Sequence, residues 1–327
     1  MPLPRIAVAT GDPAGIGPEI ALKAALDARV TAVARPLLVG DPAAVEMHAS
    51  AAGVSPRLKV VTKVADADWS NGILNLLDGR DGTNTPVEFG KVDASYGRAS
   101  LTAARRAIQA ALANDVEAVV AAPQTERSIA AAGIVFDGYP SFVARETRTP
   151  VEDVFLMICF DDKRVVHTTL HVSVRQAIAL ITPERVEHVI RVTDTALKRL
   201  GIAQPKIFVS GLNPHAGEEG LFGRDEIEII SPAIARAAAS GITVSGPFGA
   251  DTMFHKKGSD AFIVMLHDQG HIAAKLLAFN RTAGLSIGSP ILFSSVAHGS
   301  AHDIAGKGKA DPGAMVEAIT RLARVSP

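Results

Sequence analysis

The feature that most constrains this chain is the alternation of short β-branched runs with longer alanine-rich stretches. Apolar runs at 6–10, 116–122 and 261–266 predict strands, whereas 94–113 and 183–200 carry apolar residues at helical spacing. Strands that alternate with helices along a chain are typical of α/β folds with a largely parallel sheet. The sequence therefore predicts an α/β protein.

Length and composition bound the size of this fold. The 327 residues correspond to about two domains or one large α/β unit. Hydrophobic residues make up 47% of the chain and charged residues 20%, which provides for a large core and excludes a disordered tail protein or a fibre. The stretch 66–88 is the most turn-like, and we interpret it as surface loops.

Charge and composition also exclude several partners. A net charge of −1 points to neither nucleic acid nor an anionic membrane. No apolar stretch approaches the roughly 20 residues of a membrane span, and no secretory signal opens the chain. We therefore expect a soluble, cytoplasmic protein. The single cysteine, Cys159, excludes a disulfide framework and a cysteine-rich zinc site.

Histidines follow or end three of the predicted strands: His171, His215 and His267. In open α/β sheets, ligand sites gather at the carboxyl ends of the strands. Three imidazoles at such an edge can bind a divalent metal and leave positions open for a substrate. Each histidine alone equally fits a hydrogen-bonded loop residue, so their shared placement carries the metal hypothesis. Asp268 either adds charge beside His267 or caps a helix.

Two glycine-rich segments have the composition of ligand loops. The glycines of 11–19 do not match the G-x-G-x-x-G spacing of a dinucleotide fingerprint, so this segment is either a structural turn or a loop that lines a cleft. The run 298–308 is rich in small residues that let a ligand approach the backbone. His298 fits an adenine contact and Asp303 a ribose hydroxyl, although an ordinary glycine-rich loop has the same composition.

These motifs resemble those of known dehydrogenases. Residues 299–301 with 303–308 resemble the NAD-binding loop of the isocitrate and isopropylmalate dehydrogenase superfamily, whose members bind NAD without that fingerprint. The chain more closely resembles one branch, the 4-hydroxythreonine-4-phosphate dehydrogenase family. The matching motifs run in family order: 11–19, 213–218, 246–247 with 250–252, 267–270 and the His298 loop.

The resemblance implies a homodimer of two-domain subunits, each with a central cleft. It places the first α/β domain at 1–120 plus 245–327, with the NAD loop at 298–308. The second domain, at 121–244, would carry the substrate, metal and dimer contacts. Residues implied to bind NAD, with NADP not excluded, are His298, Gly299, Ser300, Asp303, Gly306 and Lys307.

The resemblance also implies a divalent metal ion, which could be zinc, magnesium, manganese or cobalt. Its ligands would be His171, His215 and His267, with the third supplied by the partner subunit. Residues implied to catalyse proton transfer or to orient the substrate are Lys275, Asp251 and Asp268. Lys275 also fits a solvated helix lysine.

The chain departs from the pyridoxine-pathway enzymes at positions expected to contact the substrate. Tyr139-Pro140 replaces a His-Thr pair, Gly284 replaces an Asn, and Phe293 replaces an Arg. Since Arg is the natural bidentate partner of a phosphate, its loss favours a flat, ring-like substrate. Segments 138–141, 170–175 and 265–272 resemble a sister group, the terephthalate cis-dihydrodiol dehydrogenases. The substrate-binding candidates are Tyr139, Ser141, Arg175, Gly284 and Phe293, although Arg175 also fits a surface ion pair.

These observations predict a metal-dependent, NAD-linked enzyme that oxidises a hydroxy acid and then decarboxylates it. The favoured substrate is a cis-dihydrodiol dicarboxylate that becomes a catechol acid. The alternatives are 4-hydroxythreonine-4-phosphate, as in pyridoxal phosphate biosynthesis, or a related sugar-acid phosphate. A non-catalytic binding module and a metal-dependent hydrolase are competing classes. The three intact histidines disfavour the first, and the glycine-rich loop around His298 disfavours the second.

Overall fold

The computed structural model describes residues 2–80, 86–278 and 282–324. The chain forms two compact units, one from residues 1–148 with 290–327 and the other from residues 149–289. We call them unit 1 and unit 2. Each contains six neighbouring β-strands with helices on both faces, so the α/β prediction is confirmed.

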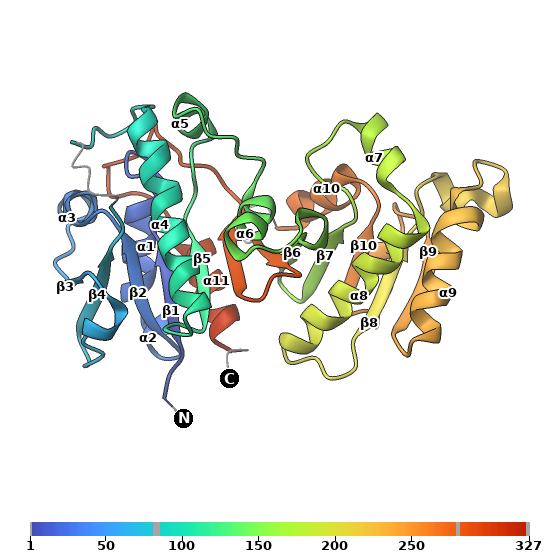
Figure 1. The fold of residues 1–327 in the computed structure, drawn as a ribbon, viewed down its shortest axis with the longest axis horizontal. Helices are drawn as coiled ribbons and strands as arrows, with labels where there is room; N and C mark the ends of the chain where they lie inside the picture. The colour runs from blue at the N-terminus through green and yellow to red at the C-terminus, as the bar shows by residue number, and fades with distance from the viewer. Residues whose placement is uncertain (1, 81–85, 279–281, 325–327) are drawn as a thin grey trace. The chain divides into compact units, whose positions relative to one another are not determined.

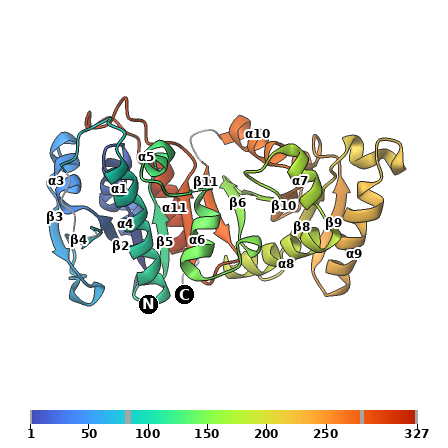
Figure 2. The ribbon, with the colours of Figure 1, turned by 45° about the horizontal axis from the view of Figure 1, so that its top comes forward.

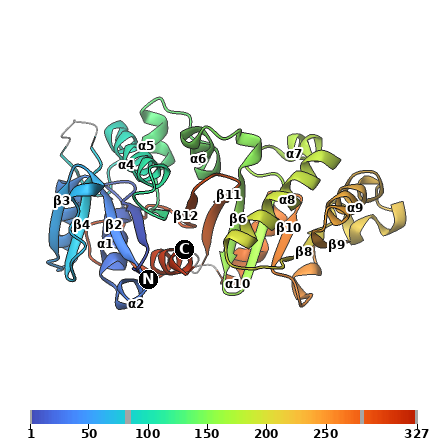
Figure 3. The same ribbon diagram turned by 60° about the horizontal axis from the view of Figure 1, so that its bottom comes forward.

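The sheet of unit 1 is entirely parallel. Its strands lie in the order β3-β4-β2-β1-β5-β12. Helix α4 covers one face, and α1 with α11 covers the other (Figure 3). The elements of unit 1 are β1 (Arg5–Ala9), α1 (Gly17–Leu26), α2 (Ala28–Thr31), β2 (Arg35–Gly40), α3 (Pro42–Ala51), β3 (Arg57–Val61), β4 (Ile73–Asp78), α4 (Ala94–Leu112), β5 (Ala118–Ala121), α5 (Glu126–Ala131), α6 (Tyr139–Thr147), β12 (Leu292–Val296) and α11 (Gly313–Ala323).

The sheet of unit 2 is mixed, in the order β11-β6-β7-β10-β8-β9. Strand β6 pairs antiparallel with β11 and β7, and the strands from β7 to β9 are parallel. Helices α7 and α10 lie at the same end of this sheet (Figures 1 and 2). The elements of unit 2 are β6 (Phe155–Phe160), β7 (Lys163–His167), α7 (Val174–Leu180), α8 (Pro183–Arg199), β8 (Lys206–Ser210), α9 (Ser231–Ala239), β9 (Thr243–Phe248), β10 (Ala261–Val264), α10 (His267–Ala278) and β11 (Ala283–Ile287).

The boundaries of the units differ from the expected division at 120/121 and 244/245. Segment 122–148 stays in unit 1 because its helices α5 and α6 pack on α4. Segment 245–289 stays in unit 2 because β10 and β11 pair with strands of the second sheet. Sheet pairing therefore sets the division, at positions that the composition does not mark.

The interpretation of 66–88 as surface loops is wrong for 73–78, which form the buried strand β4 between β2 and β3. The polar residue Asn75 interrupts the apolar run of this strand, so the sequence pattern does not indicate it. Asn75 is 1% exposed, and its side-chain amide bonds the backbone N–H and C=O of Asp68. Residues 81–85 of the interpreted segment lie outside the described residues.

Helix α4 supplies much of the core of unit 1. Leu101, Ala104 and Ile108 are buried against the sheet, as the helical spacing predicts. Leu112, expected on the same face, is 42% exposed at the last helical residue. Truncating a buried leucine of this kind to alanine typically costs about 2–5 kcal/mol of stability.

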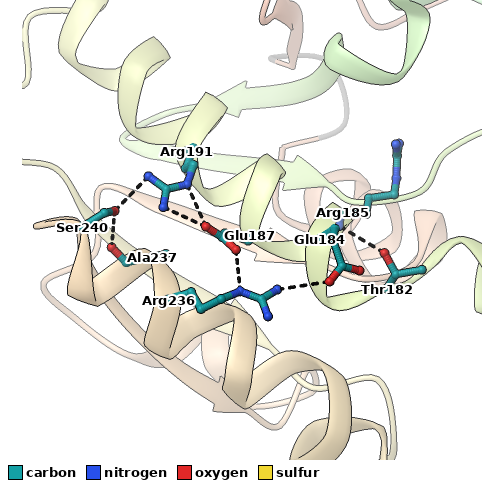
Figure 4. A network of polar contacts seen from close by, with 8 residues as sticks. All are labelled: Thr182, Glu184, Arg185, Glu187, Arg191, Arg236, Ala237 and Ser240. Carbon is teal, nitrogen blue, oxygen red and sulfur yellow. Dashed lines mark hydrogen bonds and ion pairs between the residues drawn. The ribbon is translucent and has the colours of Figure 1, made fainter.

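In unit 2, an ion-pair network joins α8 to α9 (Figure 4). The guanidinium groups of Arg191 and Arg236 each donate to the carboxylate of Glu187, at 2.7 Å and 2.6 Å respectively. Arg236 also lies 3.6 Å from Glu184. The Arg191 and Arg236 guanidinium groups hold the pKa of Glu187 below its usual value. The Thr182 hydroxyl caps the first turn of α8, so the helix is fixed at its start and along its outer face.

Candidate functional site

The carboxyl ends of β1, β5 and β12 meet at one edge of the unit 1 sheet because these strands are parallel neighbours. The loops that follow them bring together Asp12, Thr125, Ser300 and His302. Nε2 of His302 lies 3.2 Å from Asp12 Oδ2 and 3.0 Å from Thr125 Oγ1. The Thr125 hydroxyl donates to Ser300 Oγ at 2.9 Å. We call these side chains the Asp12 cluster.

The Asp12 cluster is largely buried. Asp12 is fully buried, and its other carboxylate oxygen accepts the backbone N–H of Ala14 at 2.9 Å. Ser300 is 7% exposed. The glycine-rich turn at 11–17 supports the loop after β12, since the Ile16 N–H donates to the Ser300 carbonyl. A Cβ at Gly15 would lie 2.6 Å from Ser300 Cβ, so the packing requires glycine there. The turn therefore acts as a structural support.

The six predicted NAD-binding residues lie on the loop after β12 in unit 1. Ser300 is buried in the Asp12 cluster, whereas Asp303 and Lys307 are exposed, and the Lys307 ammonium donates to the Asp303 carbonyl. Gly299 has open space where a Cβ would be. Gly306 has a positive φ of 73° and lies against the ring of Phe89. His298 is partly exposed beside the Gly299 carbonyl. The backbone is thus open at Gly299 and anchored at Ser300 and Gly306.

Gln124 is a polar residue beside this edge that the sequence analysis missed. Its side chain lies near the Tyr139 hydroxyl. Neither its amide nitrogen nor its oxygen has a partner in hydrogen-bonding geometry among the residues that the structure describes. Buried polar atoms of this kind normally find partners, and the Tyr139 hydroxyl is the polar group near this amide. The signal in the sequence was the position of Gln124 three residues after the end of β5.

Two of the predicted substrate-binding residues pack into the core of unit 1. Phe293 is 1% exposed, and its ring lies 5.0 Å from that of Tyr139. The Tyr139 hydroxyl donates to the Ala122 carbonyl at 3.0 Å, and burial raises the pKa of this phenol. Ser141 lies in the first turn of α6 and bonds Asp137. Phe293 therefore occupies a core position and does not offer an open apolar face.

In unit 2, the parallel neighbours β7, β10 and β8 carry the three predicted metal ligands after their carboxyl ends. The rings of His171 and His267 lie 5.7 Å apart. Nδ1 of His267 lies 2.7 Å from the Asp268 carboxylate, which leaves Nε2 of His267 available as a donor atom. His215 is exposed, and its ring centre lies 6.0 Å from that of Phe222.

Two further histidines, His167 and His271, pack against this pair. His271 stacks on His267 with the ring centres 3.8 Å apart, and its Nδ1 lies 3.0 Å from His167 Nε2. Burial and the neighbouring His271 lower the pKa of His167 to about 3. Burial and His267 lower the pKa of His271 to about 4. These imidazoles are neutral at physiological pH. His271 follows His267 by four residues, so the helical period could have placed both on one face of α10.

The donor set in unit 2 partly fits a divalent metal. His171 and His267 are adjacent, and Asp268 orients one of them as carboxylates orient metal-bound histidines. Within residues 2–80, 86–278 and 282–324, no group of three His, Cys, Asp or Glu side chains converges on one metal position. One chain therefore brings two predicted ligands together and keeps His215 apart.

The other predicted residues of unit 2 are dispersed. Asp251 is exposed and lines a cavity of about 650 Å³ together with Lys163 and Lys256. Lys275 is half-buried in the last turn of α10, where its charge contributes to lowering the pKa of His271. Arg175 is exposed on α7. Gly284 is buried in β11 opposite Ile158, in the middle of the strand.

Comparison with known proteins identifies the group to which this arrangement belongs. Residues 32–322 match the family model described as "Pyridoxal phosphate biosynthetic protein PdxA". The chain belongs to the PdxA family. Its curated relatives include a "Putative D-threonate 4-phosphate dehydrogenase" of Symbiobacterium thermophilum, which is 40% identical over 97% of this chain and 95% of that protein.

Solved structures of the PdxA family have the same fold. The 4-hydroxythreonine-4-phosphate dehydrogenase of Klebsiella pneumoniae superimposes with a TM-score of 0.87 at 35% identity, over 99% of this chain and all of that one. A terephthalate 1,2-cis-dihydrodiol dehydrogenase of Burkholderia xenovorans gives a TM-score of 0.71 at 40% identity, over 99% and 98%. These relatives are dehydrogenases, so the PdxA-family chain is an oxidoreductase. The resemblance inferred from the sequence motifs is confirmed.

Unit 2 of this PdxA-family protein exposes many large apolar side chains around its histidines. Helix α7 and the loop before it expose Val172, Val174, Ile178 and Leu180, α10 exposes Ile272, Leu276 and Leu277, and the segment after His215 exposes Leu221, Phe222 and Ile227. Exposed apolar groups concentrated in this way mark interaction surfaces. None of the helices in the described part of the chain has the length and hydropathy of a membrane span.

Proposed function

We propose that the chain is an NAD-linked, divalent-metal-dependent dehydrogenase that oxidises a small hydroxy acid and promotes the loss of its carboxylate as carbon dioxide. The observation that carries this proposal is the edge of the unit 2 sheet, where the imidazoles of His171 and His267 are neighbours and Asp268 orients His267. Neutral imidazoles with one ring nitrogen held by a carboxylate are typical divalent-metal ligands.

When bound, NAD supplies the hydride acceptor and the divalent ion supplies Lewis acidity toward the substrate oxygen. The chain's own residues bind and orient the reactants. His171, His267 and a third histidine would hold the metal, and the loop after β12 would hold NAD at the open backbone of Gly299. Lys275 is our candidate for moving the proton of the substrate hydroxyl, with Asp251 and Asp268 orienting the substrate.

We propose that a second copy of this chain completes the metal site. Two of the three ligand histidines lie together in one chain, and large apolar side chains around them face solvent on α7, α10 and the segment after His215. An obligate homodimer buries apolar surface of this kind. Association would then serve both to cover that surface and to bring a histidine of the partner to the site.

For the substrate, the first candidate is a phosphorylated four-carbon hydroxy acid of the D-threonate 4-phosphate class. The sequence argument for a flat aromatic substrate used Phe293 as an apolar face, but this ring is 1% exposed and packs on Tyr139. Relatives named for D-threonate 4-phosphate are 37% to 40% identical over nearly the whole chain. In such an acid the oxidised hydroxyl lies on the carbon next to that bearing the carboxylate, and the resulting β-keto acid loses carbon dioxide readily.

The second candidate is the cis-dihydrodiol of terephthalate. It is favoured by the absence of a cation at Phe293. A phenylalanine, whether buried or exposed, has no charged group with which to bind a phosphate. A dihydrodiol dehydrogenase from Comamonas is 38% identical over 97% of the chain. Loss of carbon dioxide from the oxidised diol yields an aromatic ring, which drives the reaction.

The test is NADH formation with the purified full-length protein, assayed in parallel on D-threonate 4-phosphate, 4-phosphohydroxy-L-threonine and the cis-dihydrodiol. Zn²⁺, Mg²⁺, Mn²⁺ and Co²⁺ are each added after removal of bound metal with a chelator, and NADP replaces NAD in a matched series. Turnover of the phosphorylated acids supports the first candidate, and turnover of the diol alone replaces it with the second. Turnover that survives complete metal removal would overturn the metal-dependent mechanism.

A further inference from the structure

The turn that carries His215 has an unusual backbone. Five successive residues adopt a left-handed conformation, with φ of 53° at His215, 54° at Ala216, 80° at Gly217, 42° at Glu218 and 55° at Glu219. Only one of them is a glycine. L-residues disfavour this conformation, and runs of it are rare in proteins. The surrounding structure has to hold such a segment in place.

Glu226 is the residue that holds this turn. It lies at the start of a π-helical turn (Glu226–Ile230) and is 3% exposed. Its Oε1 accepts the backbone N–H groups of Leu212 and Asn213, both at 2.7 Å, and its Oε2 accepts Asn213 Nδ2 at 2.9 Å. A Cβ at Gly217 would lie 2.6 Å from Oε2, so the carboxylate also packs against the turn itself.

The charge of Glu226 is met by amide donors. Among the described residues no lysine, arginine or histidine forms an ion pair with it. The short hydrogen bonds from amide N–H groups therefore stabilise the carboxylate. Hydrogen bonds to an ionised acceptor are roughly twice as strong as neutral ones. A carboxylate that is buried without a cation is costly unless its donors are fixed, so the geometry of 212–213 is coupled to the ionised side chain.

The base of the same turn is tied to the segment before His267. Gln269 Oε1 accepts the backbone N–H groups of Met265 and Leu266, at 2.9 Å and 3.0 Å, and Gln269 Nε2 donates to the Gly211 carbonyl at 3.2 Å. The backbone that precedes His215 and the backbone that precedes His267 are therefore joined by one side chain within unit 2.

We propose that Glu226 is a positioning residue, which sets the imidazole of His215 for metal binding by holding the left-handed turn. This inference rests on the proposed metal-dependent function. Glu226 does not reach the metal itself in this picture, since its oxygens are engaged by Leu212 and Asn213.

The experiment compares Co²⁺ affinity, measured by calorimetry on the full-length protein, for the wild type and Glu226→Gln. The matched control is Glu228→Gln, the same substitution at an exposed residue that pairs with Arg224. We expect Glu226→Gln to weaken Co²⁺ binding by about 10- to 100-fold, as loss of an outer-shell partner does, and Glu228→Gln to leave it unchanged. The same pair of variants is made in a His215→Ala background to form a double-mutant cycle.

If Glu226 acts through His215, Glu226→Gln changes Co²⁺ affinity less than about twofold once His215 is absent. An equal loss in both backgrounds, or no loss in either, overturns the proposal. If Glu226→Gln does not fold, Asn213→Ala removes the side-chain bonds to Glu226 Oε2 and Asp225 Oδ2 but keeps the backbone bond to Oε1, and it should produce a smaller loss with the same dependence on His215.

A second readout separates this proposal from the proposed function. The histidine side-chain NMR resonances of the metal-free protein report on His215 directly. A His215 resonance that shifts in Glu226→Gln but not in Glu228→Gln shows that Glu226 sets the surroundings of His215. If His215→Ala nevertheless leaves Co²⁺ binding intact, His215 is not a metal ligand and the proposal for metal binding is overturned. An unshifted His215 resonance in Glu226→Gln contradicts the positioning role.

Discussion

The two units collect polar side chains in the same way, at the carboxyl edge of parallel strands, but they differ in how those side chains are satisfied. In unit 1, Asp12 is fully buried and is bonded by Ala14 and His302 of its own chain. In unit 2, His171 and His215 are exposed, and the Asp268 side chain is 79% exposed. Parallel strand topology brings polar side chains to one edge in both units. Burial distinguishes the unit in which those side chains bond one another from the unit in which they remain exposed.

This difference has a physical cause. A buried carboxylate without partners is costly, so the Asp12 cluster forms as the chain folds and closes on itself. The unit 2 histidines belong to segments that expose valine, isoleucine and leucine side chains, the surface on which we propose that a second copy docks. The polar cluster of unit 1 is thus satisfied within one chain, whereas the predicted ligands of unit 2 remain exposed.

The largest expected effect is that of His171→Ala. Removal of a first ligand should weaken metal affinity by more than about 100-fold, beyond the loss expected for an outer-shell partner, and should abolish metal-dependent turnover. Because His171 is exposed, the thermal unfolding temperature should stay close to that of the wild type. His255→Ala, at an exposed histidine of the same unit, is the control. Full activity of His171→Ala without metal would contradict the mechanism.

The next effect concerns the closed cluster of unit 1. Asp12→Ala leaves the Ala14 N–H and His302 without their buried acceptor and should destabilise the protein by about 3 kcal/mol. Urea unfolding followed by the fluorescence of Trp69, the only tryptophan of the chain, reports on this unit. Asp303→Ala, on the exposed part of the loop, should change stability by less than about 0.5 kcal/mol. Similar losses in both variants would show that burial does not distinguish them.

A smaller effect depends on pH. Burial lowers the pKa of His48 below its ordinary 6.5, and its Nε2 lies 2.9 Å from the Pro13 carbonyl. Below pH 6.5 the unfolded chain therefore binds more protons at this residue than the folded chain, and stability falls as the pH is lowered. The urea midpoint read from Trp69 should drop less between pH 7 and pH 5 in His48→Gln than in the wild type. Parallel pH profiles would count against this assignment.

The smallest effect lies on the outer face of unit 2. Glu187→Gln breaks the network between α8 and α9 and should cost about 0.5 kcal/mol, since exposed ion pairs contribute little. The lowered pKa of Glu187 means that this contribution is present above its ordinary pKa of 4.5 and is lost as the pH falls through the folded value. Glu184→Gln, whose side chain is 78% exposed, should cost less still. Thermal unfolding at pH 7 and pH 4 measures both.

Much of this molecule follows from local patterns. The alternation of apolar runs with helical periods predicted α/β units, and the segments 94–113 and 183–200 correspond to α4 and α8. The position of histidines after strands placed His171 and His267 near each other, because neighbouring parallel strands end at one edge. These inferences need only side-chain periodicity and strand direction, which are local properties of the chain.

Other features required the tertiary structure because they depend on what packs against a residue. Asn75 sits in a buried strand only because the Asp68 backbone satisfies its amide. Phe293, predicted to face a substrate, is covered by Tyr139. The left-handed turn at His215 follows backbone amides that are bound by the Glu226 carboxylate, thirteen residues beyond Asn213. The sequence by itself determined the α/β class, the long helices and the placement of polar residues after strands. Burial and long-range hydrogen bonds, which no local pattern records, determined which of those residues stay available for chemistry.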